Sequence, residues 1–300
     1  MRMLRRDFLT RSALGVGGAL LSAPFLAEAK PRAKNFDPFE RVRLGKTKLK
    51  FSRVILGTGM SGGNRQSNHT RLGKEKFERL IRETHDCGVN TFDLADMYGT
   101  HPYVIPALKG IKRDKFNVIT KIWFRPGGIP EAERPNADVC VERFLRELQT
   151  DHIDLVLLHC VESAKWPEEC RRYMDALSKL KAQGKVRAVG VSCHSLPALA
   201  ACATEPWVDS VHARINPFGI RMDGKLEEVV PVLQKIHAAG KGVIGMKIIG
   251  EGKLRNDPDK RQESVKYALS LGCVDVLNVG CESTAEVDDL TSKVEAVARA

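Results

Sequence analysis

Short apolar runs alternate regularly with longer amphipathic stretches in this chain, and the pattern repeats eight times from Arg53 onward. This repeat limits the folds that the chain can adopt. The expected strands are Val54–Gly57, Asn90–Asp93, Asn117–Lys121, Ile153–His159, Val186–Ser192, Ser210–Ile215, Gly242–Met246 and Val274–Val279. The expected helices lie near 74–87, 102–109, 136–149, 167–183, 196–203, 226–239, 258–271 and 284–298. Near-continuous apolar strands separated by helices indicate a parallel sheet that is covered on its faces. Eight repeats over residues 53–300 therefore predict an α/β fold, a closed (β/α)8 TIM barrel.

An open, doubly wound sheet is the alternative architecture for such a pattern. It is disfavoured because no GxGxxG turn follows the first expected strand. Before the barrel, residues 30–52 are expected to form a linker and an N-terminal hairpin. The charged, alternating stretch 39–52 with Gly45 predicts that this hairpin closes the bottom of the barrel.

The first 29 residues have the three parts of an export signal. Arg5 and Arg6 precede the uncharged run 13–23, and Ala27 and Ala29 flank Glu28 as in a cleavage site. The paired arginines followed by Phe-Leu resemble a twin-arginine signal. The pattern predicts a partner in the twin-arginine export machinery and a periplasmic or secreted protein that leaves the membrane after signal removal. An uncleaved membrane anchor or a chance amphipathic helix remains the alternative.

Charge and cysteine content exclude other classes of function. The net charge of +11 is spread over helices in which basic and acidic residues alternate, so no nucleic-acid partner is expected. The eight cysteines form no CxxC pair and no tight cluster, which indicates neither a metal site nor a disulfide framework.

Polar residues follow three consecutive expected strands. Asp93 ends the second strand and Tyr98 follows it, Lys121 ends the third strand, and His159 ends the fourth. In a (β/α)8 barrel these positions meet at the C-terminal face, where catalytic residues gather. Asp96 is a rival to Asp93 in the same loop.

Several motifs occur in register with these strand ends. They are Leu56–Gly59, Asn90–Gly99, Thr120-Lys121, Arg143–Leu148, Asp151–Cys160 and Gly190–Cys193. Together they resemble the signatures of the aldo-keto reductase family over roughly residues 40–298. The resemblance implies hydride transfer between NAD(P)H and a carbonyl or alcohol, with Tyr98 as the general acid. It also implies that Lys121 supplies a positive charge, that Asp93 pairs with Lys121, and that His159 orients the substrate oxygen.

The resemblance also implies a set of cofactor-binding residues, although these match the family less well. Family members usually carry Ser-Asn after strand five, Gln in strand six and an aromatic residue after strand seven. The positions of this chain are Ser192-Cys193, His212 and Met246. The complete expected set is Gly57, Thr58, Ser192, Cys193, His212, Met246, Lys247, Gly250, Gly280 and Ser283. Lys247 is the candidate ligand of the pyrophosphate, with an ordinary surface lysine as the alternative.

The choice between NADP(H) and NAD(H) stays open from the sequence. Glu282 and Glu286 follow the last strand, where relatives supply cations to the 2′-phosphate, and their charges would repel it. An acidic side chain accepts a ribose hydroxyl well, which favours NADH as a hypothesis. The stretch 125–135 is a candidate substrate lid.

Three other functions remain as alternatives. Free reduced nicotinamide is not expected outside the cytoplasm, which favours an exported epimerase or internal redox enzyme that holds its nucleotide tightly. The altered cofactor positions also fit a barrel that only binds a ligand. A hydrolase would use Asp93 with an acid such as Glu162. The expected substrate is a small carbonyl or sugar-like molecule.

Overall fold

The computed structural model describes residues 34–299, so the predicted signal segment 1–29 lies outside the described residues. Within them, eight parallel strands form a closed barrel in the order β10-β3-β4-β5-β6-β7-β8-β9. The strands are β3 (Val54–Gly57), β4 (Thr91–Asp93), β5 (Asn117–Ile122), β6 (Ile153–Val161), β7 (Val186–Cys193), β8 (Ser210–Arg214), β9 (Gly242–Met246) and β10 (Val276–Val279). The predicted (β/α)8 barrel is confirmed.

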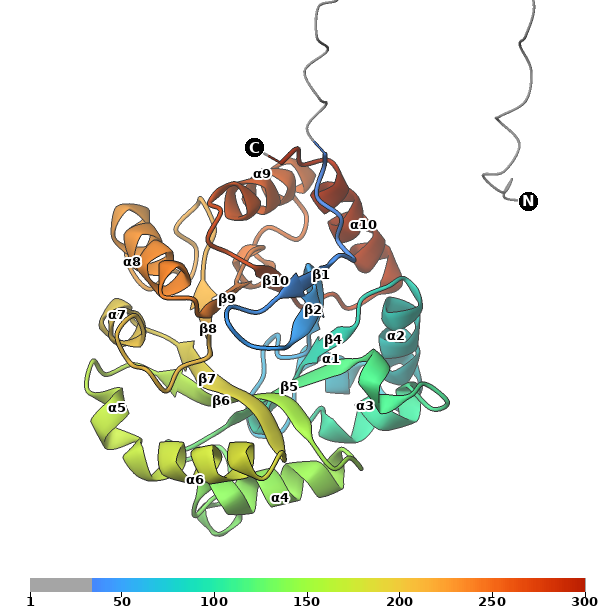
Figure 1. Cartoon of the computed structure of the whole chain (residues 1–300). Coiled ribbons are helices and arrows are strands. Elements are labelled where there is room, and N and C mark those ends of the chain that lie inside the picture. Colours follow the sequence, from blue (N-terminus) through green and yellow to red (C-terminus); the bar gives the residue numbers. More distant parts are fainter. Residues whose placement is uncertain (1–33, 300) are drawn as a thin grey trace, which may run out of the picture. The chain divides into compact units, whose positions relative to one another are not determined.

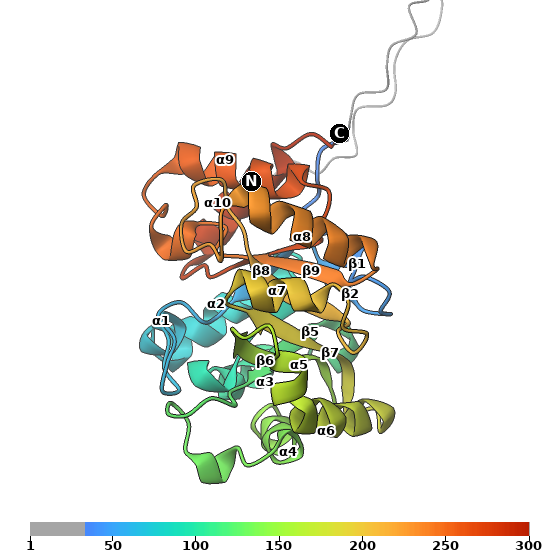
Figure 2. The same cartoon turned by 90° about the vertical axis from the view of Figure 1, so that its left-hand side faces the viewer.

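Helices surround the barrel in a ring (Figures 1 and 2). They are α1 (Asn68–Arg71), α2 (Lys74–Asp86), α3 (His101–Ala107), α4 (Ala137–Glu147), α5 (Trp166–Glu169), α6 (Arg171–Ala182), α7 (Leu196–Cys202), α8 (Leu226–Ala238), α9 (Pro258–Ser270) and α10 (Thr284–Glu295). In α2 the buried residues Phe77, Leu80, Ile81 and Thr84 recur with helical spacing, so one stripe of the helix packs on the barrel. None of the described helices is both long and apolar enough to cross a membrane.

Most bounds differ from those expected by one to three residues, and two differences change the course of an element. The helix expected over 167–183 is two helices, α5 and α6, which meet at Cys170. Strand β6 continues past His159 to Val161 through a register shift, in which Cys160 adopts a positive φ of 61°. Such a bulge redirects the end of a strand, a local change that no apolar pattern reveals.

An antiparallel hairpin of β1 (Arg41–Arg43) and β2 (Lys50–Ser52) closes the N-terminal end of the barrel, as expected, and Figure 1 shows it at the centre of the ring. Leu44, Leu49 and Phe51 are buried in the apolar layer at the bottom of the barrel interior. Gly45 turns the hairpin with a φ of 51°, and a Cβ there would collide with the backbone of Gly242. Only glycine fits that approach.

The barrel interior changes from apolar to polar toward its C-terminal end. Its apolar layer is Leu44, Leu49, Phe51, Ile55, Ile119, Leu155, Leu157, Ala188, Ile244 and Val276. Side chains on a strand return to the same face every second residue. Lys121 therefore stands above Ile119, His159 above Leu157, and Asn278 above Val276. This alternation carries the functional side chains to the C-terminal mouth.

Candidate active site

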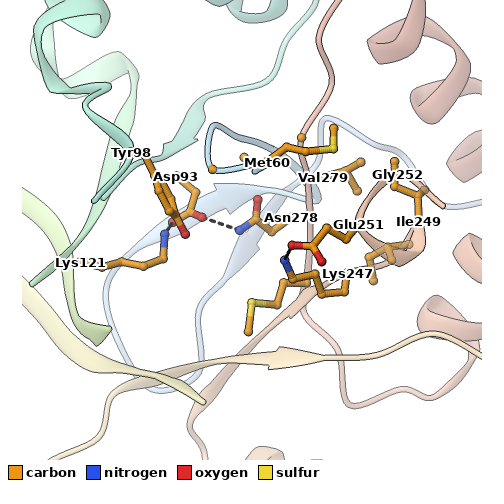
Figure 3. A pocket seen from close by; sticks show the side chains of 15 residues that line it. Met60, Asp93, Tyr98, Lys121, Lys247, Ile249, Glu251, Gly252, Asn278 and Val279 are labelled. Carbon is orange, nitrogen blue, oxygen red and sulfur yellow. Dashed lines mark hydrogen bonds and ion pairs between the residues drawn. The ribbon is translucent and has the colours of Figure 1, made fainter. Parts of the chain in front are cut away.

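A buried ion pair joins β4 and β5 at the mouth of the barrel. Lys121 Nζ donates to Asp93 Oδ1 at 2.6 Å and to the carbonyl oxygen of Leu94 at 2.8 Å. Both side chains are at most 5% exposed. Buried charges persist only when they are paired and hydrogen-bonded. The pairing expected between Asp93 and Lys121 is thus present (Figure 3).

Asn278 is a further partner of Asp93 that was not expected from the sequence. Its Nδ2 donates to Asp93 Oδ2 at 2.6 Å from the opposite side of the carboxylate (Figure 3). The signal for it was present, because Asn278 interrupts the apolar run of β10 two residues beyond inward-facing Val276. Asp93 is therefore fixed from β5 and β10 at once.

Tyr98 ends a short 3-10 turn, Asp96–Tyr98, directly after β4. Its hydroxyl lies 3.2 Å from His159 Nε2, and the two rings meet edge to face. Lys121 Nζ lies 4.9 Å from the centroid of the Tyr98 ring. A Cβ on Gly59 would collide with this ring, so the phenol fills space left by that glycine. The structure brings all four residues expected for catalysis together.

Asp96, the rival to Asp93, has a structural role. Arg143 of α4 binds both of its carboxylate oxygens, at 3.0 and 2.5 Å, and Arg65 lies 3.4 Å from one of them. Because Asp96 begins the turn that ends in Tyr98, this bidentate contact anchors the phenol from α4. Asp96 faces away from the ion pair of Asp93 and points to this arginine cluster.

Burial and charge set the protonation states of the four residues. Burial raises the pKa of Asp93, but the charge of Lys121 and the proximity of His212 outweigh it and hold the pKa below its ordinary value. Burial, with the charge of Asp93, raises the pKa of Tyr98 well above 10. Burial and the charge of Lys121 lower the pKa of His159 well below its ordinary value. Burial lowers the pKa of Lys121, and the charge and hydrogen bond of Asp93 oppose that effect. At neutral pH the site therefore holds a neutral phenol and a neutral imidazole beside the hydrogen-bonded Asp93–Lys121 pair.

Two side chains beside His159 were missed from the sequence. The rings of Trp123 and His194 lie 5.6 and 6.4 Å from that of His159. Arg214 donates to His194 Nδ1 at 2.6 Å, and burial together with this arginine lowers the pKa of His194 to about 3. Trp123, His194 and Arg214 lie at the ends of β5, β7 and β8. Their proximity to His159 could not be predicted, because it depends on the bulge in β6.

A cleft opens beside Tyr98 and Lys121 between the ends of β3, β9 and β10 (Figure 3). It is lined by Gly57, Gly59, Met60, Asp93, Tyr98, Lys121, Met246, Lys247, Ile248, Ile249, Glu251, Gly252, Asn278, Val279 and Gly280. Glycines allow a close approach to backbone, the apolar side chains can cover a ring, and Lys247 can bind a phosphate. These features fit a nicotinamide nucleotide whose ring reaches Tyr98.

Four of the residues expected to bind the cofactor line this cleft, namely Gly57, Met246, Lys247 and Gly280. Lys247 Nζ donates to Glu251 Oε1 at 2.7 Å (Figure 3), so a bound phosphate would compete with that carboxylate. Gly250 begins the turn that carries Glu251, but it packs against Ile220 outside the lining.

Three other expected cofactor ligands do not face the cleft. Cys193 points out of the barrel toward α7, where its Sγ lies 3.5 Å from that of Cys202. Thr58 is fully buried and donates to the carbonyl oxygen of Asp93. Ser283 caps the N-terminus of α10. Because each side chain is committed to packing, to an internal hydrogen bond or to helix capping, none of these contacts supports the expected role of side-chain ligand, and the three assignments stay predictions.

Ser192 and His212, also expected to bind the cofactor, lie inside the barrel but not in the lining of the cleft. They are register partners on β7 and β8, and both are buried in the barrel interior, at 1% and 0% exposure. Neither lines the cleft. His212 Nε2 lies 3.3 Å from Asp93 Oδ1.

The loop after β10 carries less uncompensated negative charge in the structure than its sequence suggests. Arg255 pairs with Glu282 at 3.0 Å and with Glu286 at 2.6 Å. Asn68 also donates to Glu282. The guanidinium of Arg255 thus partly neutralises the two carboxylates. This pairing could not be predicted from the sequence, because Arg255 lies before α9 and both glutamates follow β10.

Ion pairs attach the stretch 125–135, the candidate substrate lid, to neighbouring loops near both of its ends. Arg125 binds Glu162 in the loop after β6 at 2.5 Å, and Glu133 forms an ion pair with Arg65 in the loop after β3. Trp123 also donates to the carbonyl oxygen of Gly127. The stretch therefore lies beside the mouth, attached on two sides.

Comparison with known proteins agrees with this geometry. The model of the Aldo/keto reductase family matches residues 53–299.

The chain belongs to the aldo/keto reductase family.

A 6-dehydroglucose reductase of Agrobacterium fabrum is 32% identical over 159 residues, which are 48% of this chain and 51% of that protein. An NADH-specific methylglyoxal reductase of Escherichia coli is 28% identical over 173 residues, 51% of this chain and 52% of that protein. The chain thus spans about half the length of these curated relatives.

Solved aldo/keto reductases share the barrel. A putative aldo-keto reductase from Pseudomonas aeruginosa superposes with a TM-score of 0.69 at 22% identity, covering 86% of this chain and 96% of that one. An aldo/keto reductase from Klebsiella pneumoniae in complex with NADP and acetate gives 0.64 at 21% identity, covering 87% and 91%. At these identities the likeness establishes the fold.

Proposed function

We propose that this aldo/keto reductase transfers hydride between NAD(P)H and a small carbonyl or alcohol substrate at the face formed by Tyr98 and His159. The observation that carries the proposal is a chain of contacts at one end of the barrel. Asp93 pairs with Lys121, Lys121 Nζ lies beside the Tyr98 ring, and the Tyr98 hydroxyl lies beside His159, next to a cleft suited to a nucleotide. Membership of the family supports the same chemistry.

A nicotinamide bound in the cleft would supply the hydride to the carbonyl carbon. The chain supplies the proton and the geometry. The Tyr98 hydroxyl donates its proton to the carbonyl oxygen as negative charge develops there, and the nearby Lys121 ammonium stabilises the resulting phenolate. His159 is neutral and places Nε2 beside the same hydroxyl, so it can donate a hydrogen bond to the substrate oxygen.

The alternative functions find less support. Glu162 is half exposed and bound to Arg125, while Asp93 is held in a buried ion pair with Lys121, so these two carboxylates do not suit hydrolysis. A barrel that only binds a ligand would have no need of the buried Asp93–Lys121 pair. An epimerase that retains its nucleotide uses the same four residues and is one outcome of the test below.

The test is a panel of small aldehydes, ketones and sugars assayed with NADH and with NADPH. We expect oxidation of nucleotide that depends on the carbonyl compound. In the same assay Glu286→Gln should lower the Kd for NADPH about tenfold with little change for NADH, because it removes a carboxylate and frees Arg255 for a phosphate. Asp289→Asn, one turn along α10 and paired with Arg261, is the matched control.

No turnover across the panel, with no nucleotide released on denaturing the purified protein, would contradict the proposal. Nucleotide released in stoichiometric amount without net turnover would assign the epimerase form instead. An unchanged NADPH affinity in Glu286→Gln would refute the role given to the acidic loop.

Export through the twin-arginine pathway is part of the proposal and rests on residues 1–29. A folded-state exporter would allow nucleotide to be loaded before translocation. Replacing Arg5 and Arg6 together by lysine should move the protein from the periplasmic to the cytoplasmic fraction of a bacterial host. Equal periplasmic amounts of the two forms would argue against this route.

A further inference from the structure

His212 is buried in the barrel interior with no assigned task. It is 0% exposed, and neither ring nitrogen has a hydrogen-bond partner among residues 34–299. Leaving a buried donor unpaired costs about 1–3 kcal/mol, so native structures rarely do so. The carboxylate oxygen Asp93 Oδ1 lies 3.3 Å from Nε2, although the N–H is not aimed at it in this ring orientation.

Asp93 has room for this partner. Lys121 takes one position on Oδ1, and Asn278 takes one on Oδ2. Each carboxylate oxygen accepts two hydrogen bonds, so Oδ1 can accept a second donor from β8. An Nε2–H directed at Oδ1 over the 3.3 Å that separates them would give His212 a partner and Oδ1 its second donor.

We propose that His212 is a positioning residue, which holds Asp93 through Nε2 and so fixes the Asp93–Lys121 pair beside Tyr98. This inference rests on the proposed reductase function and replaces the role of nicotinamide ligand expected for His212 from the sequence. His212 does not line the cleft, whereas Asp93 and Lys121 do. The imidazole therefore stands behind the carboxylate as seen from the nucleotide.

The charges around His212 favour a neutral ring that donates from Nε2. Asp93 faces it from β4, Lys121 from β5 and His159 from β6. Burial lowers the pKa of His212, and Asp93 only partly offsets that effect. A neutral His212 can donate a hydrogen bond to the charged Asp93 carboxylate without placing a second cation beside Lys121.

A single-turnover assay of His212→Leu distinguishes a role in positioning Asp93 from a role in binding the nicotinamide. We expect the Kd for nucleotide to stay within about twofold of wild type, while hydride transfer at saturating nucleotide slows about ten- to a hundredfold, because Asp93 and Lys121 lose their alignment. Without the donor, the charge of Asp93 acts more strongly on Tyr98 and raises its pKa. The fall in reduction at high pH should then move to higher pH.

His212→Gln keeps a donor and should restore most of the rate. Ser210→Ala is the matched control, because Ser210 is equally buried two residues earlier on β8. A nucleotide Kd at least tenfold weaker in His212→Leu, with an unchanged rate and pH profile at saturation, would overturn the proposal in favour of cofactor binding.

A measurement without turnover keeps this test apart from that of the reductase function. Long-range 1H–15N correlation NMR of histidine-labelled protein, with His212 assigned by its loss in His212→Gln, reports the ring tautomer. We expect the Nε2–H form, with signals that shift in Asp93→Asn. An Nδ1–H form that is insensitive to Asp93→Asn would overturn the proposal even if no carbonyl substrate is found.

Discussion

Tyr98→Phe is expected to fold normally yet lose carbonyl reduction by about 10²–10⁴-fold, because it removes the donor of the proton and nothing else. Only the hydroxyl contact with His159 disappears. The ring still fills the space beside Gly59 and Gly62. Steady-state rates at saturating nucleotide, together with a thermal melt, measure the two effects separately.

Tyr103→Phe is the control for this change. Tyr103 packs on Phe77 at the edge of α3, 4.9 Å between ring centroids and outside the site, so its hydroxyl should be dispensable for turnover. A Tyr98→Phe protein that reduces carbonyls at an unimpaired rate would remove Tyr98 from the role of general acid.

Lys121→Met should lower both activity and stability. The substitution leaves the carboxylate of Asp93 buried without its cation, and breaking a buried pair in this way costs about 3–5 kcal/mol. Asp93 has a lowered pKa in the folded protein, so its paired charge stabilises the fold above its ordinary pKa and loses that effect as the pH falls. The deficit of Lys121→Met relative to wild type should therefore be largest near neutral pH and shrink in acid.

The double variant Asp93→Asn with Lys121→Met separates stability from catalysis. With both charges removed, urea denaturation should show recovery of much of the lost free energy of unfolding, while activity stays absent. A Lys121→Met protein as stable as wild type at neutral pH would contradict the importance of the pair.

The sequence predicts the barrel and the gathering of the candidate catalytic residues at one end of it, because both depend on local pattern. Asp93 ends β4, while Lys121 and His159 lie one and two residues before the ends of β5 and β6, and parallel strands place their ends at one face. The hairpin at Gly45 is equally local, since it follows from an alternating stretch with a turn residue.

The cofactor residues were less predictable because side-chain direction and long-range pairing decide them. Cys193 follows Ser192 on a strand, so the two point to opposite faces and only Ser192 faces the interior. The pairing of Arg143 with Asp96 and that of Arg255 with Glu286 join residues far apart in the chain. No local pattern indicates such contacts.

In the proposed mechanism Tyr98 delivers a proton as hydride reaches the carbonyl carbon from a nucleotide in the adjoining cleft. Transfer of deuterium from nicotinamide nucleotide labelled at C4 to a carbonyl substrate, followed by mass spectrometry of the alcohol, tests this mechanism. We expect one deuterium on the carbinol carbon with wild type and about 10²–10⁴-fold slower transfer with Tyr98→Phe. Alcohol formed without deuterium from nucleotide labelled on either face, or labelled equally fast by Tyr98→Phe, would contradict it.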